Sequence, residues 1–437
     1  MSTLQLGFLS LAAILALIAL RVPIGVALGG IAILGVVVVR GGEVAIGLVR
    51  DTPFAFVAKS DLSAIPMFLL MGAVAHHSGI SQALFRAARL WLSALPGGLA
   101  VASNFACAGF AAASGSSVAT AAAMGRIAIP EMLQQGYEKG LATGTVASAG
   151  TLGSLIPPSI LFVLYGIFAE VPIDKLLIAG VLPGLLTAAV YAAMIVARCL
   201  HNPGLAPALD PGELKSLRAR RWAALGDVWP LVLLIVGIIG GLYLGVVTPT
   251  EAGAAGAALA FVIAAAQGKF SLAMARRSLR EAMATTAQIF FVGFGAVMYT
   301  KFLALTGMSG FLGATIGGWA LDPLLLVIAA SIIFILLGMF LDPLGLLLLT
   351  LPVLLPMFEK LDLDLVWFGV LVVKYLEIGL LTPPVGFNVY VIKSVVGDTV
   401  PLETIFRGVL WFLACEVVVV ALLIAFPQIS LFLPGTM

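Results

Sequence analysis

Charged residues are scarce in this chain: Asp, Glu, Lys and Arg make up only 10% of its 437 residues, whereas 62% are apolar. A soluble protein would carry about a quarter charged residues, so a soluble globular fold is excluded. The formal net charge of +2 gives no basis for a nucleic-acid partner. Apolar stretches of about 20 residues, the length that crosses a bilayer core, recur along the chain. The composition predicts a polytopic all-α membrane protein.

Residues that build metal centres and covalent active sites are also few. The three cysteines (Cys107, Cys199 and Cys415) are scattered, and the three histidines form no ligand set. The chain has no phosphate-binding glycine loop and no Ser–His or His–Glu–His constellation in its apolar stretches. A respiratory pump subunit would carry a chain of Lys, Glu and His residues at mid-membrane. Here only Asp342, Lys301, Lys374 and Glu377 are candidates, and no chain of His residues accompanies them. We therefore expect neither an enzyme nor an ATPase.

Prolines recur with one spacing. Pro23 and Pro249 are 226 residues apart (249 − 23), and so are three further pairs. Short motifs such as Gly-Ala-Val and Val-Pro-Ile/Leu-Asp/Glu recur within three residues of that offset, which indicates a duplicated unit. The three other pairs are Pro130 with Pro356, Pro157 with Pro383, and Pro158 with Pro384.

Each unit has the same predicted order. Two helices, an amphipathic stretch and a third span precede two short apolar arms, a helix interrupted by a double proline, and a last span. Arms too short to cross comfortably indicate re-entrant hairpins, because irregular backbone at membrane depth is tolerated only inside protein or beside a cavity. The predicted domains are a first repeat, 1–200, with hairpin 97–133 and broken helix 140–169; a cytoplasmic linker, 201–227; and a second repeat, 228–437, with hairpin 324–358 and broken helix 366–396.

Five crossings per unit, an odd number, predict that the second unit is inverted relative to the first. An external N-terminus places most of the Lys and Arg residues on the inside, as the positive-inside rule requires. Both termini are therefore predicted to be periplasmic. The apolar stretch at the N-terminus has no small-residue cleavage site and is predicted to be the first span. Inverted repeats with broken helices indicate a transporter.

Four segments interrupt the helical pattern: 113–120, 150–159, 338–343 and 381–388. Glycine and proline free backbone carbonyls there, hydroxyls add hard oxygen donors suited to Na⁺, and helix N-termini favour a carboxylate. Close helix packing by small residues is the alternative explanation for any single Gly or Ser.

Charged residues at membrane depth have open roles. Asp342 is expected either to bind a cation or proton, to pair with Lys301 or Lys374, or to cap a helix. Lys374 and Glu377, three residues apart, are predicted to form an ion pair within one helix. Arg126 either contacts a carboxylate substrate or extends its side chain to the cytoplasmic face. The second alternative is favoured.

The motifs Thr248-Pro249-Thr250-Glu251-Ala252-Gly253, Phe340-Leu341-Asp342-Pro343, 150–159 and 381–388 together resemble the large membrane subunit of TRAP (tripartite ATP-independent periplasmic) transporters. The resemblance covers essentially the whole chain. It implies Na⁺-driven import without ATP, an elevator movement, a small four-helix membrane subunit as a partner, and a periplasmic binding protein that delivers a small organic acid. It also implies location in the bacterial inner membrane.

The resemblance and the break chemistry together indicate which residues bind the substrate and the coupling ion. A stand-alone Na⁺–dicarboxylate symporter without a binding protein remains the alternative. Substrate binding is predicted for Ser114, Gly115, Ser116, Ser117, Pro158, Asp342 and Pro384. Na⁺ binding is predicted for Ser116, Thr151, Gly153, Gly338, Asp342, Thr382 and Asn388.

Overall fold

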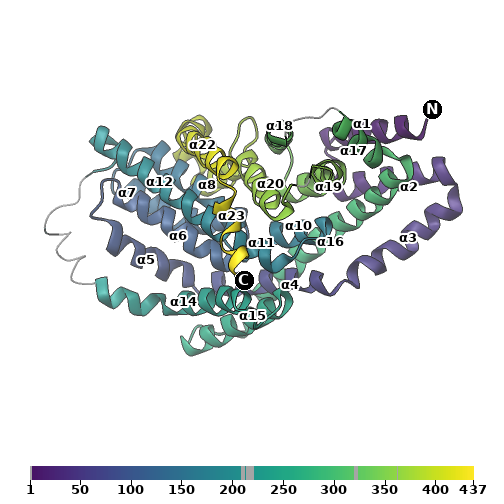
Figure 1. The fold of residues 1–437 in the computed structure, drawn as a ribbon. Helices are drawn as coiled ribbons and strands as arrows, with labels where there is room; N and C mark the ends of the chain where they lie inside the picture. Colours follow the sequence, from purple (N-terminus) through teal and green to yellow (C-terminus); the bar gives the residue numbers. More distant parts are fainter. Residues whose placement is uncertain (1, 208–211, 213–220, 319–322, 362) are drawn as a thin grey trace.

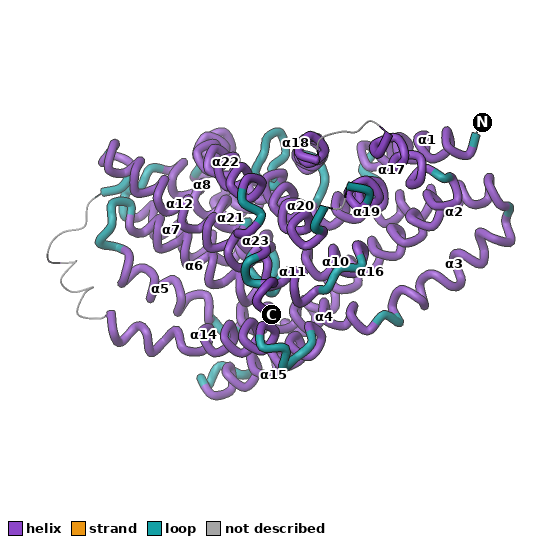
Figure 2. The backbone as a smooth tube through the Cα atoms, viewed as in Figure 1, coloured by secondary structure: helices purple, strands orange, loops and turns teal. Residues whose placement is uncertain are grey.

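The computed structural model describes residues 2–207, 212, 221–318, 323–361 and 363–437. Within these ranges every regular element is a helix, as Figure 1 and Figure 2 show, so the prediction of an all-helical chain is confirmed. The helices are arranged as an elongated body with α1 and α3 at one end and α5 and α7 near the other.

The first five helices are separated by short interruptions at glycine, proline and polar residues. Pro23 precedes α2, and Gly41, with φ of +89°, separates α2 from α3. A short 3₁₀ turn at Ser60–Ser63 leaves α3 and α4 bent by 62° to each other. The amphipathic helix α5 was not anticipated. The bounds are α1 Thr3–Ala19, α2 Ile24–Arg40, α3 Gly42–Val57, α4 Ala64–His77 and α5 Ile80–Leu92.

The middle of the first half contains a helical hairpin and a broken helix. Helices α6 and α7 meet at Gly115 and Ser116, and α8 and α9 are bent by 41° relative to α10 at the double proline. The bounds are α6 Gly98–Ser114, α7 Ser117–Gln134, α8 Lys139–Gly150, α9 Leu152–Leu155, α10 Ile160–Ala169, α11 Ile173–Ala179 and α12 Val181–His201.

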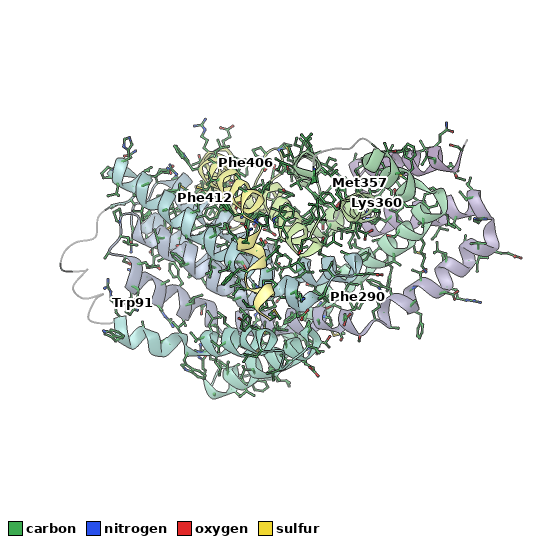
Figure 3. All side chains as sticks on the ribbon, viewed as in Figure 1. Trp91, Phe290, Met357, Lys360, Phe406 and Phe412 are labelled. Atoms are coloured by element: carbon green, nitrogen blue, oxygen red, sulfur yellow. The ribbon has the colours of Figure 1, made fainter. Side chains whose placement is uncertain are left out.

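The second half begins with α14, which starts at Arg221 and therefore takes up the last residues of the predicted 201–227 linker. Trp91, labelled in Figure 3, packs edge-on against Trp222 at 5.5 Å and joins the end of α5 to the start of α14. Residues 208–211 and 213–220 of that linker lie outside the described residues. The bounds are α14 Arg221–Tyr243, α15 Pro249–Ala266, α16 Leu272–Thr306 and α17 Met308–Gly318.

One expectation for the second half is wrong. An amphipathic stretch over 267–287 and a separate span over 288–305 were predicted, but α16 runs through both as one helix of 35 residues. No proline interrupts it. Its Gly293 packs against the ring of Phe56, and its Gly295 packs against the backbone of Gly25. The boundary in polarity along α16 is therefore a change of environment and not a break.

The second hairpin and second broken helix are followed by the last two α-helices of the chain. Helices α18 and α19 meet at residues 339–342, and α20 and α21 are separated by the residues around the second double proline. Both double prolines, 157–158 and 383–384, have a cis peptide bond. The bounds are α18 Pro323–Gly338, α19 Pro343–Glu359, α20 Leu365–Gly379, α21 Phe387–Val396, α22 Leu402–Ala425 and α23 Gln428–Leu431.

Two hydrophobic clusters divide the interior. One is rich in alanine and gathers α6, α7, α8, α12, α21 and α22; the other contains α2, α4, α15, α16, α19 and α20. Small residues allow close helix crossings in the first cluster, where a Cβ at Gly144 would lie 2.6 Å from the backbone of Gly408. The first hairpin tip and the first helix break are mostly buried, whereas Phe340 at the second tip and Pro384 and Phe387 at the second break are exposed.

Among the described residues, five helices are individually long and apolar enough to cross a membrane, and two bent pairs raise that number to seven. The bent pairs are 42–57 with 60–77, and 139–155 with 160–169. Shorter apolar helices make up both arms of the second hairpin and one arm of the first. The chain is therefore a multi-span membrane protein with bent helix pairs.

Candidate functional site

The tip of the first hairpin is formed by the four residues from Ser114 to Ser117. Gly115 ends α6 with φ of +63°, and a Cβ there would lie only 2.6 Å from the carbonyl oxygen of Pro158. Ser116 then caps α7 by accepting a hydrogen bond from the Ala119 N–H at 3.4 Å. The tip therefore rests directly on the break of the first broken helix.

That break brings the predicted residues Thr151, Gly153 and Pro158 against the same tip. A Cβ at Gly153 would lie 2.5 Å from the carbonyl oxygen of Ser116, so only glycine fits there. The Thr151 hydroxyl donates to the carbonyl of Ser148 at 2.6 Å. The backbone carbonyl of Thr151 accepts a hydrogen bond from the Ser117 hydroxyl at 3.4 Å.

The tip of the second hairpin is built around Asp342. Its carboxylate caps α19 and accepts from the Gly345 N–H at 3.0 Å, which is the helix-cap role among those considered for this residue. Gly338 ends α18 and packs against Gly379 of α20, with a Cβ position 3.1 Å from the Gly379 Cα. The second tip is thus held to the second broken helix as the first is held to its own.

The second break contains Thr382, Pro384 and Asn388. Thr382 donates to the carbonyl of Ile378 at 2.7 Å, and Asn388 donates to the carbonyl of Ala147 on α8 at 3.3 Å. The amide oxygen of the buried Asn388 has no partner among the described residues. Pro384 is exposed and stands apart from these contacts.

A cavity of about 500 Å³ lies between the two tips and α16. The first tip contributes Gly115, Ser116 and Ser117, and the second contributes Asp342. The other predicted residues are not on its wall: Ser114 lines a smaller cavity nearby, and Pro384 is exposed. Further lining residues are Ser154, Leu380 and Phe387 from the breaks and Glu281, Thr285 and Gln288 from α16.

A smaller cavity of about 180 Å³ adjoins the first along α7 and α16. Ser114, Ser116, His76 and Arg126 line it. Arg126 therefore stands where a negatively charged ligand in the cavities would meet a cation. Close by, His77 Nε2 lies 2.9 Å from a carboxylate oxygen of Glu281, joining α4 to α16.

The sequence model of one transporter family, the tripartite ATP-independent periplasmic transporter DctM component, matches residues 11–429. This chain is a member of the DctM family. It is accordingly a TRAP transporter permease of the inner membrane and not an enzyme, and the family resemblance drawn from its motifs is confirmed.

Relatives with named substrates agree with this assignment. The C4-dicarboxylate TRAP transporter large permease protein of Pseudomonas aeruginosa is 36% identical over 86% of each chain. The sialic acid TRAP transporter large permease protein of Vibrio cholerae is 32% identical over 85% of this DctM chain and 86% of the relative. The isethionate permease DctMQ of Oleidesulfovibrio alaskensis is 31% identical over 95% of this chain but only 64% of the relative.

Solved structures share the fold. Neisseria gonorrhoeae MtrF superposes with a TM-score of 0.58 at 14% identity, covering 89% of this chain and 85% of MtrF. The Alcanivorax borkumensis YdaH transporter gives 0.56 at 15% identity, covering 88% and 89%. The DctM chain therefore shares a polytopic architecture with these transporters.

The predicted ion pair within α20 is wrong. Lys374 instead lies 2.6 Å from a carboxylate oxygen of Glu416 on α22 and donates to Thr187 on α12 at 3.0 Å. The same Glu416 accepts a hydrogen bond from Tyr191. Helix spacing allowed the intrahelical pair, but a nearly completely buried carboxylate on a neighbouring helix is the stronger partner for the ammonium group.

The contact of Glu377 with the first hairpin tip was consequently not predicted. Glu377 is 1% exposed and accepts a hydrogen bond from Ser117 of the first tip at 2.7 Å. An acidic residue within the apolar stretch 365–379 was the available signal, because such groups are costly in a membrane interior.

Lys301 does not pair with Asp342. It donates a hydrogen bond to Thr52 at 3.0 Å and is not on the wall of the cavity that Asp342 lines.

Proposed function

We propose that this chain is the translocating subunit of a Na⁺-coupled, binding-protein-dependent system that imports a small organic acid. The observation that carries the proposal is the cavity of about 500 Å³ whose wall is shared by the two hairpin tips. Hydroxyls and a carboxylate there are hard oxygen donors for Na⁺. Arg126 in the adjoining cavity supplies positive charge for an anionic substrate.

Its relatives support an organic anion as the substrate. Their names specify C4-dicarboxylate, sialic acid and isethionate, each an organic acid that is charged at neutral pH. The chemistry common to these molecules is an anionic group, which helix N-termini at the main cavity and Arg126 in the adjoining cavity would receive. The Na⁺ ligands proposed are Ser116, Thr151, Gly153, Gly338, Asp342, Thr382 and Asn388.

The partners proposed are a small four-helix membrane subunit and a periplasmic binding protein. The relative named DctMQ extends well beyond the length that this chain matches, which supports a second membrane component as a partner of the permease. Two inverted repeats of five spans each, with both termini in the periplasm, complete the proposed topology. The hairpins and broken helices would then move as an elevator against a scaffold that includes α16.

Proteoliposomes containing this chain and its small subunit test the proposal. We expect uptake of a labelled organic acid only when binding protein is outside and Na⁺ is higher outside than inside. A cross-link between Ala122→Cys on α7 and Thr285→Cys on α16, which face the same cavities, should abolish uptake, and reduction should restore it. Uptake of free acid without binding protein would favour the stand-alone symporter, and full activity of the cross-linked protein would exclude the elevator.

A further inference from the structure

A cluster of oxygen atoms lies at the wall of the main cavity, where Ser117 and Ser154 belong to both. The Ser117 hydroxyl is 2.7 Å from the Ser154 hydroxyl, 2.7 Å from one carboxylate oxygen of Glu377 and 3.4 Å from the Thr151 carbonyl. These four residues come from the first hairpin, the first broken helix and the second broken helix. All four are at most 5% exposed, so bulk water does not solvate the cluster.

The carboxylate of Glu377 is incompletely satisfied. Ser117 hydrogen bonds to Oε2, whereas Oε1 is buried and has no partner among the described residues. A buried carboxylate with a free oxygen is costly unless a cation or a donor meets it. The unpartnered oxygen belongs to the same carboxylate that receives the Ser117 hydroxyl, so it lies beside the cluster.

Among Lys374, Glu377 and Glu416, one carboxylate is left without a compensating positive charge. Lys374, one turn away on the same helix, is paired with Glu416 at 2.6 Å, and Thr187 and Tyr191 each form a further hydrogen bond with that pair. One ammonium group thus compensates one carboxylate, and no ion pair joins Glu377 to a cation among the residues that the structure describes. An occupant with a single positive charge would balance the carboxylate of Glu377.

We propose that Glu377 is a direct ligand of a buried Na⁺ site completed by the hydroxyls of Ser117 and Ser154 and the carbonyl of Thr151. Hydroxyl, carbonyl and carboxylate oxygens are the donors that a hard cation prefers. The inference rests on the proposed Na⁺ coupling and deepens it. It adds to the first tip a charged ligand from the other half of the chain.

Such a site would couple ion binding to the relative position of the two halves. Ser117 begins α7, and Glu377 lies near the end of α20, 260 residues away in the sequence. An ion held between them fastens the first hairpin tip to the second broken helix beside the cavity that Ser117 and Ser154 also line. Without the ion, the free carboxylate charge weakens that junction.

Thermal unfolding of the purified protein in NaCl, KCl and choline chloride at equal ionic strength and pH 8 tests the site. Binding to the folded state alone raises the midpoint in proportion to ligand saturation, so a Na⁺ titration yields an apparent Kd. For Glu377→Gln we expect that Kd to rise by about 10-fold or more, as loss of a charged ligand implies. Glu377→Asp should give a smaller rise, and Ser154→Ala should also weaken Na⁺ binding.

Glu403→Gln is the matched control, because Glu403 is an exposed glutamate in the first turn of α22. It should retain the wild-type Kd. A Na⁺-specific shift that Glu377→Gln retains would overturn the proposed ligand but leave Na⁺ coupling intact. No Na⁺-specific shift in the wild-type protein would overturn both.

Two further outcomes decide the remaining cases. If Glu377→Gln does not fold in choline, Ser154→Ala and Glu377→Asp decide the matter, and wild-type Na⁺ affinity in both would overturn the proposal. Repeating the titration at pH 6 separates a proton from Na⁺. A midpoint that depends on pH through Glu377 and not on Na⁺ would show that the carboxylate carries a proton instead.

Discussion

The two broken helices carry different chemistry at positions 226 residues apart. Ser148 and Thr151 in the first correspond to Lys374 and Glu377 in the second (374 − 148 and 377 − 151). In the first, the Thr151 hydroxyl donates locally to the Ser148 carbonyl at 2.6 Å, and neither residue carries a charge. In the second, charges reach across the protein, to Glu416 on α22 and Ser117 on α7.

The hairpin tips differ in the same way. Ser116 and Asp342, again 226 residues apart, both cap the second helix of their hairpin, one with a neutral and one with a charged oxygen. A common backbone role thus tolerates either chemistry, whereas the long-range contacts of Lys374 and Glu377 involve a charged group. Exchanging second-half residues for their first-half counterparts, or the reverse, tests how far the two halves are equivalent.

Exchange at Lys374 should have the largest effect. Lys374→Ser leaves Glu416 buried without its cation, and breaking such a pair costs about 3–5 kcal/mol of stability. We expect a marked fall in the midpoint of thermal unfolding in every salt. Lys374→Met combined with Glu416→Leu should recover most of that loss, because it removes both charges from the interior.

Ser148→Ala is the control at the corresponding position. Its buried hydroxyl oxygen has no partner among the described residues, so the midpoint should hardly change. Equal losses for Ser148→Ala and Lys374→Ser would contradict the contrast between the two helices.

Exchange at the tips should have an intermediate effect. Leu341 corresponds to Gly115, but Gly115 has φ of +63° and touches Pro158. Gly115→Leu should cost about 1–2 kcal/mol from the left-handed backbone alone, with a collision added. Thermal unfolding and Na⁺-driven uptake should both decline, whereas Gly310→Leu, at a site with nothing within 4 Å, should leave them near wild type.

Exchange at Asp342 should have the smallest effect on stability. Its main effect is expected on the Na⁺ dependence of uptake. Asp342→Ala removes the cap of α19 and should cost about 1 kcal/mol, while Asp342→Ser retains a capping oxygen and should cost less. If the carboxylate also binds Na⁺, Asp342→Ser will still raise the Na⁺ concentration needed for half-maximal uptake. Unchanged Na⁺ dependence in both variants would restrict Asp342 to capping.

The amino-acid sequence was sufficient to locate the interruptions of the helices. Glycine, proline and hydroxyl residues mark the turns at Gly115–Ser116 and Asp342, because they determine the local backbone and capping bonds. It was less informative where polarity changes without a break, as along α16, and it omitted α5. Polarity reports the surroundings of a helix, whereas continuity depends on its backbone hydrogen bonds.

The sequence by itself determined the membrane class, the family and the helix interruptions that border the cavity, since these follow from composition, spacing and local backbone chemistry. Only the tertiary structure decided that Lys374 pairs with Glu416, that Glu377 joins Ser117, and that the two tips share a cavity. Those contacts join helices distant in the chain. A buried charge selects its partner by proximity in the folded protein, and no spacing along one helix specifies that choice.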